Sequence, residues 1–466
     1  MSRGKSWLAR LGPGVITGAS DDDPSGIATY SQVGSQFGFT FLWTLLLSYP
    51  LMAGIQEISA RIGIVTGDGL AANLRKHFPP FLLYAVVSLL LGANIVNIGA
   101  DIGAMAASLH MLLGGSMTGY IVAFGVFSVV LQVFIPYRRY VQYLKWLCLS
   151  LVAYVGVAFA VEMPWRHVLV ATLVPNVEWS TAAVTAVVAI FGTTISPYLF
   201  FWQAAEEVEE QRLSPHRSPL KQAPQQADAQ LAPMTVDTWF GMGISNVVGF
   251  FVMLTAAAVF HANGITNIQS TAQAAEALRP AAGRFAHFLF ALGIIGTGLL
   301  AVPVLAGSAA YAIGETFRWS IGLQKKPRRA RLFYATIAIS TFAGVLLNLA
   351  RVDPIKALFW SAVVNGVASA PIMVVIMVLA TRPKAMGKFK LPLRLQVLGW
   401  GATAVMMLIT ASMLALLCAP LLLSGESRRG GRVRPAHEQP VGTSHQEAGV
   451  LERLQHHAAG VPLEPR

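Results

Sequence analysis

Long apolar runs, separated by short polar segments, occupy most of the chain. A helix needs about 20 mainly apolar residues to cross a bilayer. Eleven runs reach that length, at residues 12–38, 40–60, 81–109, 119–136, 144–163, 183–205, 237–260, 286–314, 332–350, 356–380 and 396–423. The pattern therefore predicts an all-α integral membrane protein with eleven transmembrane helices.

Three polar stretches lie outside or between these runs. Residues 1–11 precede the first run, and residues 206–236 begin with Glu206-Glu207 and then become rich in Pro and Gln. The second stretch predicts a linker between two halves of the protein. Residues 424–466 are rich in Gly, Pro, Arg, His and Glu, a composition typical of a disordered tail.

Composition and charge support the membrane interpretation. Only 12% of the 466 residues are charged, against about 25% in average soluble domains. The net charge of +12 would suggest nucleic acid in a soluble chain, but here the basic residues fall between the apolar runs. With the N-terminus inside, 23 Lys and Arg lie in inside segments and 5 in outside loops. The positive-inside rule therefore predicts a cytoplasmic N-terminus and linker in a plasma or inner membrane, with lipid as the partner and no nucleic acid.

Two of the predicted spans contain helix-breaking residues near their middle. The first span contains Ser20-Asp21-Asp22-Asp23-Pro24-Ser25-Gly26, and the sixth contains Gly192-Thr193-Thr194-Ile195-Ser196-Pro197. Proline removes a helix donor, and lipid tolerates irregular backbone only where it lines a protected site. Interruptions at matching positions of two five-helix halves are typical of inverted-repeat transporters. We therefore predict two inverted repeats, at 12–163 and 183–380, with helices 1 and 6 broken and helix 11 at 396–423.

Three consecutive carboxylates at the first break point to a cation. Each acid at the bilayer centre costs about 2.5–3.5 kcal/mol on insertion scales. Asp23 lies directly at the break and is the expected ligand, whereas Asp21 and Asp22 either join the site or hydrate an aqueous vestibule. Thr193 and Ser196 offer hydroxyls and freed carbonyls, and neither break contains His, Cys or Met. Oxygen donors favour hard ions such as magnesium, manganese or calcium, with sodium left open.

Other polar residues within the runs carry weaker signals. Glu57 and Arg61 have the i,i+4 spacing of a helix ion pair. Asp101 is either a proton relay or a group bound to water, and Asn365 either lines the site or makes an interhelical hydrogen bond. The two cysteines, Cys148 and Cys418, cannot form a disulfide framework, and we expect both to be small buried side chains.

Several motifs resemble the Nramp (natural resistance-associated macrophage protein) family, which comprises proton-linked importers of manganese and iron. The second span contains Gln56-Glu57-Ile58-Ser59-Ala60-Arg61-Ile62-Gly63, and the seventh contains Thr255-Ala256-Ala257-Ala258-Val259-Phe260-His261-Ala262-Asn263-Gly264. The similarity covers roughly residues 10–420. It implies two inverted five-helix repeats, with one further helix in this chain.

The departures from the family motifs concern the metal ligands. The family's Asp-Pro-Gly-Asn reads Asp23-Pro24-Ser25-Gly26, so Gly26 stands where the family has its Asn ligand. The family's Met-Pro-His-Asn reads Ser196-Pro197-Tyr198-Leu199, so Ser196 replaces the metal-binding Met and Tyr198 replaces the His. The resemblance implies that Thr193 lends a backbone carbonyl. It matches Asp101 to a glutamate on the proton path, whose acidic partner is replaced by Ile98.

These losses resemble the divergent branch of Nramp-related magnesium transporters, which is thought to carry partly hydrated ions without proton coupling. We therefore predict a secondary transporter for Mg²⁺ or Mn²⁺ that works by alternating access around Asp23. It would not be an enzyme, and the metal would be its substrate, with no cofactor. Its oligomeric state is not predicted.

Three alternative functions come from the same residues. A sodium-coupled symporter of an organic solute would share the fold, but Asp21, Asp22 and Asp23 would repel a substrate carboxylate. An intramembrane hydrolase finds poor support in Gly67-Asp68-Gly69 and His110, which lie in a loop and at a span end. A metal-sensing receptor without transport stays open.

Overall fold

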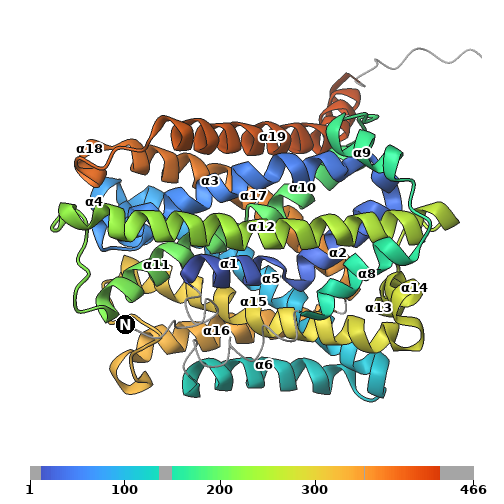
Figure 1. The fold of residues 1–466 in the computed structure, drawn as a ribbon, viewed down its shortest axis with the longest axis horizontal. Helices are drawn as coiled ribbons and strands as arrows, with labels where there is room; N and C mark the ends of the chain where they lie inside the picture. The colour runs from blue at the N-terminus through green and yellow to red at the C-terminus, as the bar shows by residue number, and fades with distance from the viewer. Residues whose placement is uncertain (1–11, 136–148, 351, 431–466) are drawn as a thin grey trace, which may run out of the picture. The chain divides into compact units, whose positions relative to one another are not determined.

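The computed structural model describes residues 12–135, 149–350 and 352–430, with side chains up to Cys418. Within these ranges the ordered elements are helices, and no strand occurs (Figure 1). The prediction of an all-α, multi-pass membrane protein is confirmed. The chain divides into a large unit, residues 1–416, and a C-terminal unit, residues 417–466, of which the described part completes the last helix.

The first half begins with a span made of two short helices. A two-residue gap separates α1 from α2, as the sequence predicts. The predicted fifth span at 144–163 is described only from residue 149 onward. The helices that form the spans of this half are α1 (Pro13–Asp21), α2 (Pro24–Phe37), α3 (Leu42–Thr66), α5 (Pro80–Leu113), α6 (Met117–Phe134) and α8 (Val152–Ala160).

The second half repeats this plan, again starting with an interrupted span. Two residues, Ile195 and Ser196, separate α10 from α11. The long helices here are α10 (Thr181–Thr194), α11 (Pro197–Leu213), α12 (Ala227–Val259), α15 (Ala286–Thr316), α16 (Arg331–Leu347), α17 (Pro354–Thr381) and α19 (Leu393–Gly430).

Short helices connect the long ones. Beyond the predicted spans, α4 follows α3, and α9 precedes α10. These connecting elements are η2 (Gly38–Phe41), α4 (Leu70–His77), η3 (Leu149–Leu151), α9 (Trp165–Leu173), η4 (Pro224–Gln226), η5 (His261–Asn263), α13 (Thr271–Ala275), η6 (Glu276–Leu278), α14 (Arg279–Ala282), η7 (Gly283–Phe285), η8 (Pro327–Arg329), η9 (Asn348–Ala350) and α18 (Pro383–Met386).

Three predicted boundaries and one predicted burial need correction. Helix α11 continues to Leu213 and α12 begins at Ala227, so the linker predicted at 206–236 shrinks to 214–226. Glutamate is a good helix former, and Glu206 and Glu207 are buried within α11. Helix α19 includes residues 424–430 of the predicted tail, and the rest of the tail lies outside the described residues. Cys418 is exposed on α19, and Cys148 is outside the described residues.

The predicted number of eleven spans is not confirmed. Nine segments of the described chain are long and apolar enough to cross a membrane. The difference has two sources, because α2 and α3 count as one segment, Pro24–Thr66, and the fifth predicted span is described only in part.

Helices of the two halves pack against each other in a reciprocal way. The first span, α1 and α2, packs on α12 of the second half, and the sixth span, α10 and α11, contacts α3 of the first half. Helix α5 packs on α15, its counterpart in the second half. This exchange of partners between equivalent helices fits two repeats folded into one body.

Helix α1 lies unusually close to α12, and the two run side by side in Figure 1. A Cβ on Gly18 would come within 2.3 Å of the backbone of Gly241, so only glycine permits this approach. The Asp237 carboxylate accepts hydrogen bonds from the backbone N–H groups of Gly12 (3.2 Å) and Gly14 (2.7 Å). Asp237 therefore caps the N-terminus of α1, where backbone donors lack helical partners.

Three segments predicted on the same side of the membrane meet at one end of the helices. The Lys221 ammonium donates to the Lys384 carbonyl at 3.2 Å, and the Arg382 guanidinium donates to the His77 carbonyl. Burial, together with the positive charges of Lys221 and Arg382, lowers the pKa of His77. The basic loops that follow α3, α11 and α17 therefore lie close together.

Candidate functional site

The first helix break is organised around the carboxylate of Asp23. Helix α1 ends at Asp21, and Asp23 is the N-cap of α2. Its Oδ1 accepts hydrogen bonds from the Ser25 hydroxyl and the Gly26 backbone N–H, both at 2.7 Å. The start of α2 is where backbone donors lack helical partners, so an acidic N-cap is locally stable there. Asp23 is nevertheless only 2% exposed.

The second break has no charged residue, and the hydroxyl of its Ser196 bonds to backbone carbonyls of the preceding helix. The Ser196 hydroxyl contacts the carbonyls of Gly192 (2.8 Å) and Thr193 (3.0 Å), which lie one turn earlier. The Ser369 hydroxyl of α17 donates to the Ile195 carbonyl. Ser196, predicted as a ligand, thus has its hydroxyl committed to the end of α10.

The two breaks meet at Gly26 and Thr193. A Cβ built on Gly26 would lie 3.0 Å from the Thr193 hydroxyl oxygen and 3.5 Å from Oδ1 of Asp23. The Tyr198 hydroxyl of α11 donates to the Ser20 carbonyl of α1 at 3.1 Å. Asp23, Thr193 and Ser196 are each at most 2% exposed. The structure therefore brings the sequence-predicted residues of both breaks into one buried region.

Asn97 of α5 is the residue of this region that sequence reasoning missed. Its amide nitrogen donates to Oδ2 of Asp23 at 3.0 Å and to Oδ2 of Asp101 at 3.1 Å. Its carbonyl oxygen accepts from the Asn365 amide at 2.9 Å. A signal was available, because Asn97 is a polar amide within an apolar run and lies four residues before Asp101. Family comparison drew attention to its neighbour Ile98 instead.

This network settles where Asp101 and Asn365 lie. All three side chains, Asn97, Asp101 and Asn365, are fully buried. Asn365 makes the interhelical hydrogen bond that was one of its two predicted roles. Oδ1 of Asp101 and Oδ1 of Asn365 have no hydrogen-bond partner among the described residues. Acceptor oxygens at this depth are costly unless something donates to them or binds them.

Asp21 and Asp22 contact α12 instead of an open vestibule. Their exposed fractions are 4% and 8%. The Ser245 hydroxyl lies 2.6 Å from Oδ2 of Asp21 and 3.0 Å from Oδ1 of Asp22. A hydroxyl has a single hydrogen, so it can donate to only one of the two carboxylates. Ser245 was not predicted, because only the folded structure places it beside the first break.

Glu57 and Arg61 form a structural cluster on α3. Their side chains lie 3.7 Å apart, and Arg394 of α19 lies 3.5 Å from the same carboxylate. Glu57 also accepts from the Thr235 hydroxyl (2.9 Å) and the Trp239 indole N–H (2.8 Å). The carboxylate therefore ties α3 to α12 and α19.

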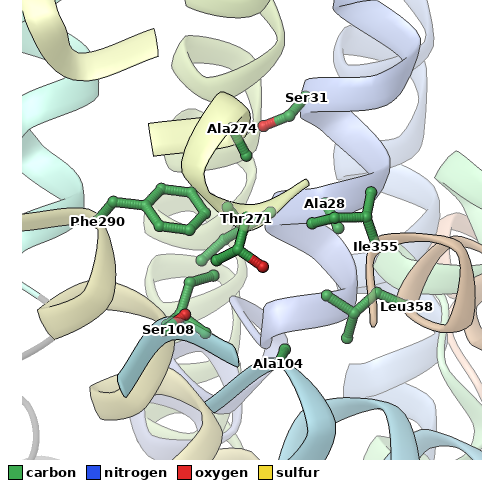
Figure 2. Close-up of a pocket in the computed structure, with 11 residues that line it drawn as sticks. Ala28, Ser31, Ala104, Ser108, Thr271, Ala274, Phe290, Ile355 and Leu358 are labelled. Atoms are coloured by element: carbon green, nitrogen blue, oxygen red, sulfur yellow. The ribbon is translucent and has the colours of Figure 1, made fainter. Parts of the chain in front are cut away.

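A narrow cavity lies next to the site and is lined by residues of α2 and four other helices. Figure 2 shows it between α2, α5, α13, α15 and α17, with apolar walls. Ala28 and Ala104 line it, close along their helices to Gly26 and Asp101. Its volume is about 10 Å³, which is room for about one water molecule. Ser31, Ser108 and Thr271 bring hydroxyls to its wall.

The acids of the site do not form a metal cage by themselves. Among the described residues, no group of three or more His, Cys, Asp or Glu side chains is arranged to hold a metal ion. The adjacent Asp21, Asp22 and Asp23 point to different partners, Ser245 for the first two and Asn97 for the third. An ion here would need backbone carbonyls, hydroxyls, amides or its own waters as further ligands.

Comparisons with known proteins agree with this arrangement. The divalent metal cation transporter MntH of Klebsiella pneumoniae is 27% identical over 410 residues, which is 86% of this chain and 92% of that protein. The Eremococcus coleocola manganese transporter structure aligns with a TM-score of 0.69 at 19% identity, covering 92% of this chain and 94% of that one.

A more distant fold neighbour is Mhp1, a nucleobase–cation-symport-1 family transporter. Its TM-score is 0.53 at 13% identity, over 86% of this chain and 92% of that one. Finally, the family model described as natural resistance-associated macrophage protein-like matches residues 14–416. The chain, with its two broken helices meeting at a buried aspartate, therefore belongs to the Nramp family.

Proposed function

We propose that this protein is a secondary transporter that moves Mg²⁺ or Mn²⁺ across a membrane by alternating access around Asp23. One observation carries the proposal. The Asp23 carboxylate is buried where the two broken helices meet, and the donors that contact it, from Ser25, Gly26 and Asn97, are neutral. Neutral donors stabilise the carboxylate but leave its charge for a cation to balance.

The donor set favours a hard ion that keeps some of its water. Asp23 already accepts three hydrogen bonds, and the Ser196 hydroxyl contacts carbonyls of its own helix. An ion at the break would therefore meet one carboxylate with neutral oxygens beside it. Magnesium dehydrates reluctantly and is commonly held by one or two carboxylates with several waters. The similarity to a divalent metal cation transporter and a manganese transporter supports the same class of substrate.

We infer transport without proton coupling. Position 98 carries an isoleucine, so Asp101 has no acidic neighbour one turn earlier on α5. Asp101 instead accepts a hydrogen bond from Asn97, which also donates to Asp23. A proton released from Asp23 would meet an amide, which is neither an acid nor a base in the physiological range.

The uneven distribution of Lys and Arg between the two ends of the helices supports a cytoplasmic N-terminus in a plasma or inner membrane. The basic segments around His77, Lys221 and Arg382 meet at one end of the helices. An excess of Lys and Arg marks the cytoplasmic side. The expected partners of the protein are the lipid bilayer and the transported ion, and we expect neither nucleic acid nor a cofactor.

An organic solute fits the described site less well. Asp21, Asp22 and Asp23 place negative charge at the first break, where they would repel the carboxylate of such a solute. A cation is the better match in sign.

The proposal is tested by competition among divalent ions in reconstituted vesicles, with internal pH recorded. We expect saturable Mn²⁺ uptake that Mg²⁺ inhibits at comparable concentrations and no acidification that tracks metal entry. Vesicles containing the Asp23→Ala variant serve as the inactive control. Uptake that is unaffected by Asp23→Ala would remove Asp23 from the site, and acidification in step with uptake would overturn the absence of proton coupling.

A further inference from the structure

Asn97 links the two buried carboxylates of the transport site, Asp23 and Asp101. Both amide hydrogens are used, one toward each carboxylate, at 3.0 and 3.1 Å. The amide oxygen accepts from Asn365 of α17 at 2.9 Å, which fixes the direction in which the nitrogen points. Every polar atom of Asn97 therefore has a partner, and all of these groups are fully or almost fully buried.

The orientation of this amide has an electrostatic consequence. The positive end of the amide dipole faces Asp23 and Asp101, and the negative end faces Asn365. Hydrogen bonds to a charged acceptor are stronger than those between neutral groups. Asn97 thus offers the two carboxylates the kind of stabilisation that a bound cation offers, but from a group that stays with the protein.

A carrier needs such a group at one particular step. After it releases its ion, net transport requires the site to return across the membrane without cargo, with Asp23 still buried. Exchange of one ion for another does not include that step, because the site crosses loaded in both directions. A residue that stabilises the unloaded carboxylates is therefore needed for net uptake but not for exchange.

We propose that Asn97 is a positioning residue that takes the place of the cation at Asp23 and Asp101 while the unloaded carrier reorients. This inference rests on the proposed transport function and adds a role for a residue outside the two helix breaks. When the ion arrives, its own positive charge and its bound waters replace the donation from Asn97 to Asp23. Asn365 supports the same role by holding the Asn97 amide in its orientation.

The test compares net uptake with exchange in the same vesicles, using Mn²⁺ as the probe. Net uptake is measured into vesicles without internal metal, and exchange is measured with labelled Mn²⁺ outside and unlabelled Mn²⁺ inside. The variant Asn97→Leu removes both donors with little change in size. We expect net uptake to fall by about tenfold or more, since two hydrogen bonds to charged groups are lost, while exchange stays within about twofold of the unmodified protein.

Asn94→Leu is the matched control, because it changes the same residue type one turn earlier on α5. Asn94 is also fully buried, but its amide donates to the Leu305 carbonyl and the Ser308 hydroxyl, both at 2.8 Å. Any loss there should affect net uptake and exchange equally. Asn365→Ala keeps Asn97 but removes its orienting partner, and we expect a smaller fall that is again confined to net uptake.

The possible outcomes separate the role of Asn97 from the proposed transport function. Equal loss of net uptake and exchange in folded Asn97→Leu, or no loss of either, overturns the role of Asn97. If Asn97→Leu does not fold, Asn365→Ala decides by the same ratio of net uptake to exchange. If the unmodified protein catalyses neither process, the proposed function itself fails, and the role of Asn97 falls with it.

Discussion

The two helix breaks have the same backbone plan but opposite chemistry. Each has a two-residue gap followed by a proline that starts the next helix. In the first, the N-cap is Asp23, whose carboxylate reaches α5 through Asn97. In the second, the N-cap is Ser196, whose hydroxyl folds back onto the carbonyls of Gly192 and Thr193. The first break holds a carboxylate that accepts a hydrogen bond from α5, whereas the Ser196 hydroxyl of the second break bonds within its own span and Ser369 of α17 donates to the Ile195 carbonyl.

The difference between Asp23 and Ser196 gives the two breaks different roles in the proposed transport site. Equivalent interruptions expose equivalent backbone groups, which any polar residue can satisfy. A buried charge costs more free energy than an exposed backbone group, because it needs a counter-charge or several hydrogen-bond donors. In the proposed transport site, the first break would set the sign of the substrate, and the second would contribute neutral oxygens. The following variants test this division, from the largest expected effect to the smallest.

Removing the charge from the first break should have the largest effect. Asp23→Asn keeps the size of the side chain but leaves no negative charge for the ion. We expect Mn²⁺ uptake to fall by about a hundredfold, since a buried charge pair contributes about 3 kcal/mol or more. Asp228→Asn, at the start of α12 and outside the site, is the control. Uptake near the unmodified level in Asp23→Asn would show that the sign of the substrate is set elsewhere.

Closing the space between the breaks should have the next largest effect. Gly26→Ala places a methyl group 3.0 Å from the Thr193 hydroxyl oxygen and 3.5 Å from Oδ1 of Asp23. We expect uptake to fall by about tenfold, because such crowding typically costs about 1–3 kcal/mol and about 1.4 kcal/mol corresponds to a factor of ten.

Two further variants make this prediction specific. Combining Gly26→Ala with Thr193→Ala removes the crowded hydroxyl and should restore part of the uptake. Gly92→Ala on α5, where a Cβ meets nothing within 4 Å, should leave uptake unchanged. A loss in Gly92→Ala equal to that in Gly26→Ala would mean that the effect comes from general helix packing.

Giving the second break a soft ligand should change selectivity more than rate. Ser196→Met introduces a thioether, which favours softer metals over magnesium. We expect the preference for Cd²⁺ over Mg²⁺ to rise by about tenfold, as one favourable ligand contact of about 1.4 kcal/mol would give. The same substitution at Ser214, the C-cap of α11, should not alter the preference. A flat selectivity profile in Ser196→Met would exclude position 196 from the ion's surroundings.

The contact that joins the two broken spans should have the smallest effect. Tyr198→Phe removes the hydrogen bond from α11 to the Ser20 carbonyl of α1. We expect a loss of about 1 kcal/mol in stability, measured as a lower unfolding temperature in detergent, with uptake nearly unchanged. A loss of uptake comparable to that of Gly26→Ala would instead place the tyrosine hydroxyl in the transport path.

Local signals in the sequence determined the helical membrane fold and both breaks. Apolar runs of sufficient length predict spans because the bilayer offers no partners for the backbone, and Pro24 and Pro197 mark the gaps because proline cannot donate to a helix. The linker predicted at 206–236 is too long at both ends, because acidic residues such as Glu206 and Glu207 are as compatible with a buried helix end as with a loop.

Only the tertiary structure decided which side chains surround the carboxylates. Asn97, Ser245 and Asn365 come from three helices that are far apart in the sequence. Their polarity within apolar runs marks Asn97 and Asn365 as unusual, but it does not say which carboxylate or amide each one contacts. Helix periodicity assigns a residue to a face, but which helix packs against that face depends on how all the helices assemble. The sequence alone therefore located the charge in the membrane, and the packing of the two halves determined what stabilises it.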